Sequence, residues 1–475
     1  MTGKVYVLGE GITVSADPRL QADVRLGSLY NEAVDLESLL TPALFRENAQ
    51  VFQPLEFDAG GESQPGAGVL ELNGVADHTL VTAENPLVLT LDEGPLVDDL
   101  VLPYAFDGEF FLPVGNSQSR DGRTEIYIEH LPMPPAEGAL ESMASIAIMF
   151  RKIAADVVGT DFDYPQLAAA FVTDDGRVTY ETGPAEVRRQ VAEAEHILLY
   201  VHGLFGSSEG YVASAVAAEV EDGGQPPKLA EKYDLILAFD YESVNTPVEL
   251  TARQLRQKLE EAGLAAGHGK RLHIVAHSLG GLVSRWFVEQ EGGNEIVQHL
   301  VTAGTPHRGT PWPKLHDWAT TLLVLGLNGL SSVAWPVKIA ASLVKATEAI
   351  DVTVDQMDPK SDFMKLLATN TDPGIPITAL AGNTSIDPAA LQIQAGETSS
   401  RLERLLSRLE EMKLLQKAAG LAFYGRPNDI AVGVKSALGL PAGHAQVTAV
   451  EIACDHMSFF LLSESLQKLD EALAG

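Results

Sequence analysis

The sequence predicts an α/β fold with a mostly parallel sheet over residues 136–475, and a β-rich module over residues 1–135. From about His196 onward, short apolar runs alternate with helical patterns, which is typical of parallel strands with helices on both faces of the sheet. Residues 1–135 contain instead many short strand-like runs separated by Gly, Asp, Asn and Pro. The stretch Leu131–Pro135 is expected to connect the two parts, because proline continues neither a helix nor a strand ladder.

Four runs in the N-terminal part have strand character and predict a sandwich or a partial barrel. They are Val5–Leu8, Gly68–Leu72, Leu87–Leu91 and Glu125–Ile128. Beyond the connector, apolar residues of Ala139–Val158 recur at helical spacing, so this segment is expected to be a helix.

The C-terminal part is expected to begin with a hairpin over Phe171–Tyr180, closed by an Asp-Gly turn, and a helix over Pro184–Glu195. Helical patterns follow over Pro247–Ala262 and Leu282–Glu291. Catalytic groups in open α/β sheets lie beyond the carboxyl ends of the strands, so the residues after each strand run are the candidates for chemistry. The expected strand cores are Ile197–Val201, Leu235–Phe239, Leu272–Ala276, Leu300–Ala303, Ile377–Ala381 and Val447–Ile452.

Charge and composition exclude several classes of function. The 475 residues include 65 Asp plus Glu against 33 Lys plus Arg, a net charge of −32, which would repel nucleic-acid phosphates. Cys454 is the single cysteine, so no intrachain disulfide can form. The longest uncharged stretch, Trp318–Val337, is broken by Gly, Asn and Pro, so no stable membrane span is expected. Residues 1–16 lack the features of a secretory signal, and we expect a cytoplasmic protein.

The sharpest motif surrounds Ser278. The buried strand Leu272–Ala276 runs into His277-Ser278-Leu279-Gly280-Gly281, and a helix follows. A strand-to-helix elbow strains the central residue and requires small residues two before and two after it; here these are Ala276 and Gly280. The elbow exposes the serine hydroxyl, so Ser278 is the predicted nucleophile.

A second strand, Ile197–Val201, runs into His202-Gly203-Leu204-Phe205-Gly206, where glycine allows a backbone N–H to turn inward. We expect the amides of Leu204 and Leu279 to form an oxyanion hole, with Phe205 as the alternative to Leu204. His202 is expected to bond backbone groups rather than to act as the base.

The base must be a histidine that reaches the serine hydroxyl. His456 follows the last strand run and is the predicted base. His277 is held within the elbow, His444 precedes a strand, and His307 lies near an active loop, so structural roles are expected for these three.

The acid should lie between nucleophile and base in chain order. Asp387 and Asp429 both follow the strand Ile377–Ala381. Spacing favours Asp387, whereas the apolar run Ile430–Val434 favours a buried Asp429, so the residues alone leave the two open.

Together these motifs resemble the α/β-hydrolase-fold lipases and esterases, especially the bacterial triacylglycerol lipase and lecithin–cholesterol acyltransferase-like branch. The resemblance covers about Tyr164–Leu473 and implies an α/β-hydrolase fold. It also favours Asp429, since the acid of that branch lies in an Asp-Gly-x-Val motif, although Ile430 stands here where Gly is usual. The insert at residues 311–367 occupies the position of a cap or lid. The motifs that carry the resemblance are His202–Gly206, Ala276–Gly281, Gly304–Gly309, Asn428–Val432 and Asp455-His456.

We therefore expect a serine carboxylic ester hydrolase of the lipase/esterase type, with an acyl-enzyme on Ser278, His456 and Asp429. The apolar cap region favours hydrophobic acyl or lipid esters as substrates. Alternatives are an acyltransferase with the same triad, or a regulatory or interaction protein that carries a hydrolase-fold domain. No metal or organic cofactor is expected, and the β-rich module could bind a protein partner.

Overall fold

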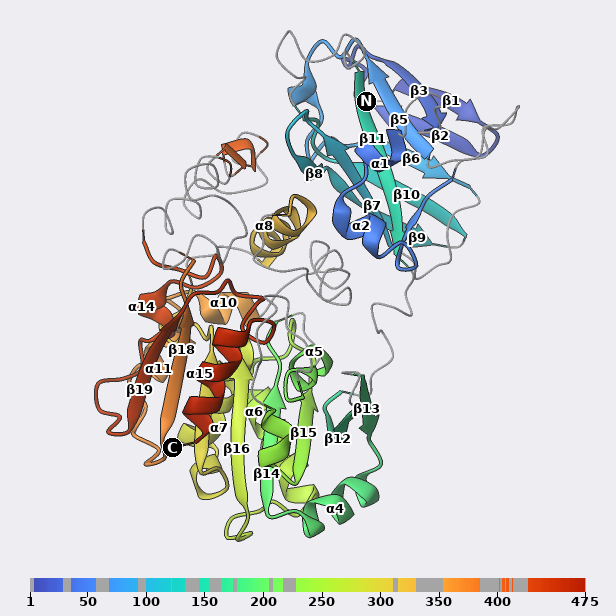
Figure 1. Ribbon diagram of the computed structural model, residues 1–475. Coiled ribbons are helices and arrows are strands. Elements are labelled where there is room, and N and C mark those ends of the chain that lie inside the picture. The colour runs from blue at the N-terminus through green and yellow to red at the C-terminus, as the bar shows by residue number, and fades with distance from the viewer. Residues whose placement is uncertain are drawn as a thin grey trace.

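A computed structural model of the chain describes most of both halves (Figure 1). The described residues are 4–28, 36–56, 68–92, 100–120, 122–132, 145–153, 164–173, 177–204, 208–216, 228–310, 315–329, 353–384, 401, 404–405, 407–409, 412 and 426–474.

Two antiparallel sheets form the N-terminal part, and strands cover all four of the runs predicted there. Short helices α1 (Leu36–Leu39) and α2 (Ala43–Glu47) and a 3-10 turn at His78–Leu80 accompany them. One sheet has the order β1 (Lys4–Gly9), β2 (Ile12–Ala16), β6 (Leu87–Leu91), β10 (Arg123–Ile128) and β9 (Gly115–Arg120). The other has the order β3 (Asp23–Ser28), β5 (Gly68–Asn73), β11 (Ser145–Ile153), β7 (Leu100–Phe106) and β8 (Phe111–Pro113), with β4 (Phe52–Pro54) paired to β11.

Strand β11 corrects the expected helix at Ala139–Val158, because residues 145–153 pair antiparallel with both β5 and β7. The run Ser-Ile-Ala-Ile-Met-Phe fits the helical and the strand period about equally well, and short apolar runs cannot be assigned by periodicity alone. Pairing on both edges decides in favour of the strand, and it buries Ile146, Ile148 and Phe150. The division into two domains at residue 135 stays a prediction; the pairing of β11 favours a boundary after Ile153.

The C-terminal part is built on an eight-stranded sheet whose six later strands are parallel. The predicted pairing of the two hairpin strands is present as β12 and β13, which extend the sheet beyond β15, while the expected Asp-Gly turn between them lies outside the described residues. All six expected strand cores are present. The sheet order is β13 (Val178–Glu181), β12 (Gln166–Val172), β15 (Leu235–Asp240), β14 (His196–Val201), β16 (Arg271–His277), β17 (His299–Ala303), β18 (Ile377–Gly382) and β19 (Val447–Ile452).

Helices cover both faces of this sheet. Alternate residues of β14 belong to two separate apolar clusters: Ile197 and Leu199 to one, Leu198 and Tyr200 to the other. The first cluster includes side chains of α6 and α7, and the second includes side chains of α15. The helices of this part are α4 (Pro184–Glu193), α5 (Glu209–Ala213), α6 (Val248–Glu261), α7 (Leu279–Gln290), α8 (Leu315–Leu327), α10 (Thr353–Met357), α11 (Asp362–Leu367), α14 (Val434–Ala437) and α15 (Ser463–Leu473), with 3-10 turns at Leu229–Lys232 and Gly293–Glu295.

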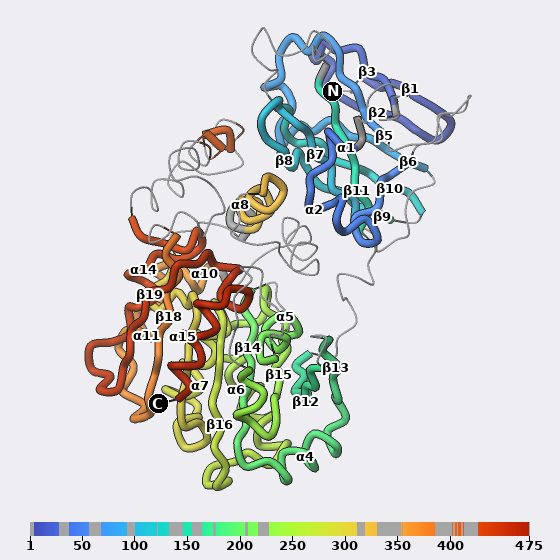
Figure 2. Tube along the Cα trace, in the orientation of Figure 1, coloured from blue at the N-terminus to red at the C-terminus, as the bar shows by residue number. Residues whose placement is uncertain are grey.

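The strand order determines at which edge of the sheet the candidate catalytic loops lie. Strand β14 is central, and the chain adds β15 on one side of it and then β16, β17, β18 and β19 on the other. Figure 2 shows this progression from green β14 to red β19. Because these strands are parallel, the loops that follow β14, β16, β17, β18 and β19 all leave at the same edge.

Candidate active site

Ser278 occupies a strained elbow between β16 and α7. Its backbone has φ 50° and ψ −122°, a conformation that L-residues rarely adopt. The loop after β14 approaches this elbow closely: a Cβ on Gly280 would lie 2.2 Å from the carbonyl oxygen of His202. The small residues that the sequence analysis required are therefore needed for packing as well as for the turn.

His456 reaches this serine across the sheet edge. Its Nε2 lies 2.9 Å from Ser278 Oγ, within hydrogen-bond distance, although 178 residues separate the two. His456 lies in the loop after β19, and its side chain is buried. The structure thus brings together the two groups that the sequence reasoning paired.

Asp429 lies on the other side of the imidazole. Its Oδ2 is 2.8 Å from His456 Nδ1, and its backbone carbonyl accepts a hydrogen bond of 2.9 Å from the His456 N–H. The second carboxylate oxygen, Oδ1, accepts bonds from the N–H groups of Ala431 (3.0 Å) and Val432 (2.6 Å). Both oxygens are therefore held, and the carboxylate cannot rotate without breaking a bond. The competing candidate, Asp387, lies outside the described residues.

The turn that carries Asp429 is itself strained. Ile430 has φ 81°, in the left-handed region that is unfavourable for a β-branched residue. Its N–H donates to the side chain of Asn428 at 2.7 Å, which fixes the turn. The resemblance placed glycine at this position, and the backbone here keeps the conformation that glycine adopts readily.

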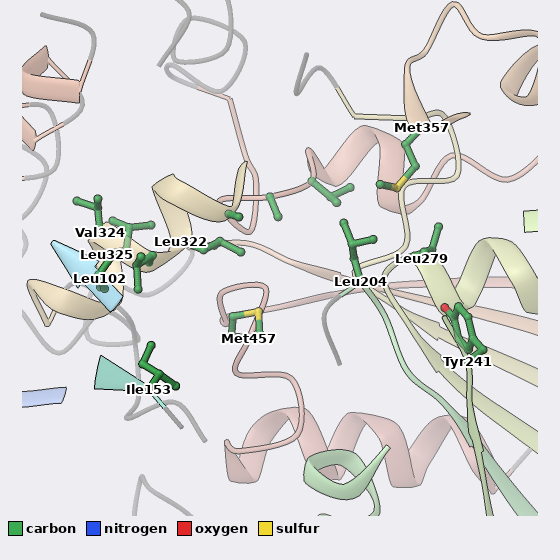
Figure 3. Close-up of a cluster of buried hydrophobic side chains, with 14 of the residues drawn as sticks. Leu102, Ile153, Leu204, Tyr241, Leu279, Leu322, Val324, Leu325, Met357 and Met457 are labelled. Atoms are coloured by element: carbon green, nitrogen blue, oxygen red, sulfur yellow. The ribbon is translucent and has the colours of Figure 1, made fainter. Parts of the chain in front are cut away.

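The two expected oxyanion donors lie close to the serine. Leu279 is the first residue of α7, and Leu204 follows the His-Gly pair after β14; their side chains are labelled in Figure 3. Among the described residues, neither backbone N–H finds a hydrogen-bond acceptor. Both amides are thus available to an anionic oxygen. The alternative donor, Phe205, lies outside the described residues.

His202 orients this loop and does not act on the serine. The Tyr241 N–H donates to its Nε2 at 3.1 Å, so the proton lies on Nδ1, which donates to the carbonyl of Gly203 at 2.7 Å. The Gly203 C=O and the Leu204 N–H belong to one trans peptide unit, in which the two bonds point in opposite directions. Fixing the Gly203 carbonyl therefore directs the Leu204 N–H away from His202. The ring of His202 also stacks on that of Tyr241.

His277 supports the loop of the predicted base. Its Nε2 lies 2.8 Å from the carbonyl oxygen of His456, which can only accept, so Nε2 carries the proton. Its Nδ1 then accepts from the hydroxyl of Tyr211 at 3.0 Å. Sequence reasoning missed Tyr211 entirely, because nothing in its local sequence links α5 to a histidine 66 residues away.

Gly304 is a second residue whose role was missed. A Cβ at this position would lie 3.0 Å from His456 Nδ1 and 3.1 Å from Asp429 Oδ2, and its φ is 59°. Any side chain there would press on the hydrogen bond between the two. The sequence shows the motif Gly304-Thr305-Pro306, and this close approach explains why its first residue is a glycine.

His307 and His444 belong to a buried polar cluster beside the site. His307 Nε2 lies 3.0 Å from Thr302 Oγ1, and its Nδ1 lies 3.4 Å from Arg285 Nη1. Arg285 pairs with Glu289 at 2.8 Å, with both side chains fully buried. His444 Nε2 lies 3.9 Å from Glu289. Neither histidine makes a hydrogen bond to Ser278 among the described residues, and both ring nitrogens of His444 are buried there without a hydrogen-bond partner.

Burial has a consequence for the pH dependence of stability. Loss of hydration lowers the pKa values of His202, His277 and His307 below the ordinary value of 6.5. The folded protein therefore keeps these rings neutral at a pH where the unfolded chain binds protons. The stabilisation is present above pH 6.5 and is lost as the pH falls below it.

We expect the free energy of unfolding to fall by up to about 1.4 kcal/mol per pH unit for each of these histidines as the pH drops from 6.5 toward 5. Urea denaturation at pH 7.5, 6.5, 5.5 and 5 measures the slope. His307→Gln should reduce the slope of the free energy of unfolding against pH by the amount that corresponds to about one bound proton. A free energy of unfolding that stays constant between pH 7.5 and 5 would contradict the expectation.

Within the described residues, no group of three His, Cys, Asp or Glu side chains is placed to hold a metal ion. Of the helices in the described ranges, none has the length and apolar character needed to cross a membrane.

A protein-family model described as a domain of unknown function, DUF7379, matches residues 168–474, which is more than half of the chain. The chain belongs to the DUF7379 family. The match begins within β12 and ends in α15, so it takes in nearly the whole eight-stranded sheet and the residues around Ser278. No curated protein matches this DUF7379 chain in sequence.

Several solved structures resemble this DUF7379 chain distantly. The mature form of the lipase BlEst2 from Bacillus licheniformis is 19% identical, with 59% of this chain and 91% of that chain covered and a TM-score of 0.36. A monoacylglycerol lipase from Paleococcus ferrophilus is 16% identical, with 58% and 91% covered and a TM-score of 0.29. A bacterial membrane phospholipase A is 14% identical, with 59% and 79% covered and a TM-score of 0.31. Likeness at this level assigns no activity.

Proposed function

We propose that the C-terminal part has an α/β-hydrolase fold and that the protein is a serine carboxylic ester hydrolase. One observation carries the proposal: the imidazole of His456 lies between Ser278 Oγ, at 2.9 Å, and Asp429 Oδ2, at 2.8 Å. The strained backbone of Ser278 supports it, because such strain is a feature of nucleophile elbows. Three side chains from distant loops make a chain of hydrogen bonds that suits a nucleophile, a base and an orienting acid.

Acylation follows from these positions. Ser278 Oγ attacks the ester carbonyl carbon while His456 Nε2 takes the hydroxyl proton. The carbonyl oxygen becomes an anion and accepts hydrogen bonds from the N–H groups of Leu204 and Leu279, each of which contributes about 3 kcal/mol to transition-state stabilisation. The tetrahedral intermediate then breaks its bond to the leaving oxygen. His456 gives its proton to that oxygen, and the alcohol departs.

Deacylation repeats the sequence with water. A water molecule attacks the acyl carbon, His456 Nε2 takes its proton, and the bond to Ser278 Oγ breaks as the proton returns to the serine. Asp429 stays ionised throughout. It keeps the His456 proton on Nδ1 in the resting state and stabilises the imidazolium during each proton transfer.

Apolar side chains around the serine favour hydrophobic acyl esters as substrates. Leu204, Leu279, Met457 and Met357 belong to one buried apolar cluster that also includes Leu322 of α8 (Figure 3). Apolar surroundings of this kind favour a hydrocarbon chain over a charged group. Helix α8 lies in the insert 311–367, so the cluster supports the cap proposed for that segment.

A fluorophosphonate probe tests the function directly. The probe should label the protein covalently, and mass spectrometry should place the label on the peptide that contains Ser278. The same preparation should hydrolyse p-nitrophenyl butyrate, and pretreatment with the probe should abolish that hydrolysis. Labelling of a different serine, or unmodified protein after prolonged exposure, would overturn the proposal.

A further inference from the structure

Helix α8 is buried on all sides over residues 319–325, which are mostly apolar, so it must pack against more than one neighbour. Residues 319–325 form two turns, and every one of them is buried. A helix without a polar face is stable in water only between two packed bodies. The secondary-structure elements that pack most closely on α8 are β8 and α2, which belong to the N-terminal part (Figure 1). Helix α8, which belongs to the C-terminal half of the chain, thus packs against the N-terminal module.

Asn328, just after α8, makes the most specific contact. Its Oδ1 accepts from the Phe111 N–H at 2.8 Å, and its Nδ2 donates to the Phe111 carbonyl at 2.8 Å. Strand β8 is the edge of its sheet, so without Asn328 both backbone groups would lack a partner strand. Asn328 also donates to the carbonyl of Val324 at 2.8 Å, which fixes its side chain to the helix. The amide takes the place of a neighbouring strand.

The turn between β7 and β8 makes a second contact, by charge. Asp107 is buried, and its Oδ1 accepts from the N–H groups of Glu109 and Phe110 at 2.9 and 2.7 Å. Its other oxygen lies 3.2 Å from Arg408 Nε. Glu109 pairs with Arg404 at 2.7 Å. A buried carboxylate is costly unless it is paired, so Arg408 is the more important of the two arginines.

An aromatic contact completes this second set. The guanidinium of Arg401 lies 5.7 Å from the ring centre of Phe110, within the range of a cation–π interaction. Arg401 belongs to the same stretch as Arg404 and Arg408. We call residues 107–111 the clamp turn, because one short turn contacts Asn328 at the end of α8 and also Arg401, Arg404 and Arg408.

The two clamped segments belong to inserts that follow strands β17 and β18, which end at the sheet edge where Ser278 lies. Helix α8 belongs to the insert between β17 and β18, and residues 401–412 belong to the insert between β18 and the turn of Asp429. The apolar cluster of Figure 3 runs from Leu102 of the module through Leu322 of α8 to Met457, the neighbour of His456. A contact on the module is therefore continuous with the surroundings of the reacting groups.

We propose that the N-terminal module holds helix α8 in place through the clamp turn and thereby determines which acyl chains reach Ser278. This rests on the proposed ester hydrolysis for its substrate and on the observed contacts for its mechanism. When the clamp is intact, α8 supplies apolar surface for a long acyl chain. When the clamp is weakened, that surface is lost, whereas a short ester still reaches the serine and the oxyanion amides.

The test uses the full chain and Asn328→Asp, which keeps the shape of the side chain but replaces the Nδ2 donor with an oxygen facing two carbonyls. We expect amide hydrogen exchange in residues 319–329 to become at least tenfold faster. The kcat/KM for p-nitrophenyl decanoate should fall about fivefold, mainly through KM, with p-nitrophenyl acetate within twofold of the wild type. Asn294→Asp is the matched control, because the Asn294 amide also donates to a backbone carbonyl, that of Pro373, but far along the chain from the clamp.

Arg408→Glu provides a second, independent variant. It places a carboxylate beside the buried carboxylate of Asp107, and Arg408→Gln separates loss of the ion pair from like-charge repulsion. The rate of amide hydrogen exchange in residues 107–111 should increase from the wild type to Arg408→Gln and again to Arg408→Glu. The ratio of p-nitrophenyl decanoate to p-nitrophenyl acetate hydrolysis should decrease in the same order. Arg256→Glu, which disrupts an exposed pair with Glu260 on α6, should change neither quantity.

The outcomes separate the two proposals. Exchange and chain-length ratios in Asn328→Asp that equal those of Asn294→Asp would overturn the clamp, whatever the wild type hydrolyses. A wild type that neither hydrolyses esters nor reacts with the fluorophosphonate overturns the proposed function, and with it the selection of acyl chains. Faster exchange with unchanged chain-length ratios overturns the link between the clamp and the substrate.

Discussion

Ser278→Ala should reduce ester hydrolysis by about a million-fold, leaving only the weak residual catalysis that the oxyanion amides support, while the protein stays folded. The substitution removes the oxygen that forms the acyl-enzyme, and members of a triad act as a unit, so the remaining residues cannot compensate. His456→Ala should have an effect of similar size, because the hydroxyl then has no base. The lost hydrogen bond to His456 should change the free energy of unfolding by only about 1 kcal/mol.

Steady-state hydrolysis of p-nitrophenyl butyrate and thermal unfolding of each variant measure these effects. Ser284→Ala is the matched control, since Ser284 is a buried serine on α7 whose hydroxyl has no hydrogen-bond partner among the described residues. It should keep near wild-type turnover. Full activity in Ser278→Ala would refute the assignment of the nucleophile.

Asp429→Asn should lower kcat by about ten thousand-fold with little change in KM. The asparagine keeps the size of the side chain, and its oxygen can still accept from the N–H groups of Ala431 and Val432. Its NH₂ group then faces His456 Nδ1, which must become the acceptor. The imidazole proton then lies on Nε2. A protonated Nε2 cannot accept the hydroxyl proton of Ser278, so the base is lost.

Asp387→Asn provides the comparison that the sequence left open. We expect it to keep most of the activity, because the bond between Asp429 Oδ2 and His456 is already made. Turnover measured as a function of pH adds a second criterion, since only the loss of the true acid should alter the pH profile of kcat. A larger loss in Asp387→Asn than in Asp429→Asn would transfer the role to Asp387.

Most of the eight-stranded sheet could be predicted because its strands are buried on both faces. A continuous apolar run such as Ile197–Val201 leaves few alternatives when turn residues flank it. The helix predicted for Ala139–Val158 is wrong because the isoleucines and methionines of this segment fit either period. The partners that decide it, β5 and β7, lie 40 to 80 residues earlier in the chain, and local patterning contains no information about them.

The candidate site was predictable to a similar extent. The local steric requirement pointed to Ser278 and strand order pointed to His456, and the structure places these two side chains within hydrogen-bond distance. The choice between Asp387 and Asp429 could not be read from the sequence, since it depends on how a turn offers the amides of Ala431 and Val432 to one carboxylate oxygen. The same holds for Tyr211, whose position near His277 arises only when two loops meet.

The clamp turn has a consequence for the order in which the chain folds. The bond between Phe111 and Asn328 joins residues 217 positions apart, and that between Glu109 and Arg404 joins residues 295 apart. All strands of the first two sheets lie within Lys4–Ile153, so these sheets can be complete on the ribosome before α8 has been translated. Helix α8 then docks late in protein synthesis, onto N-terminal sheets that have already folded.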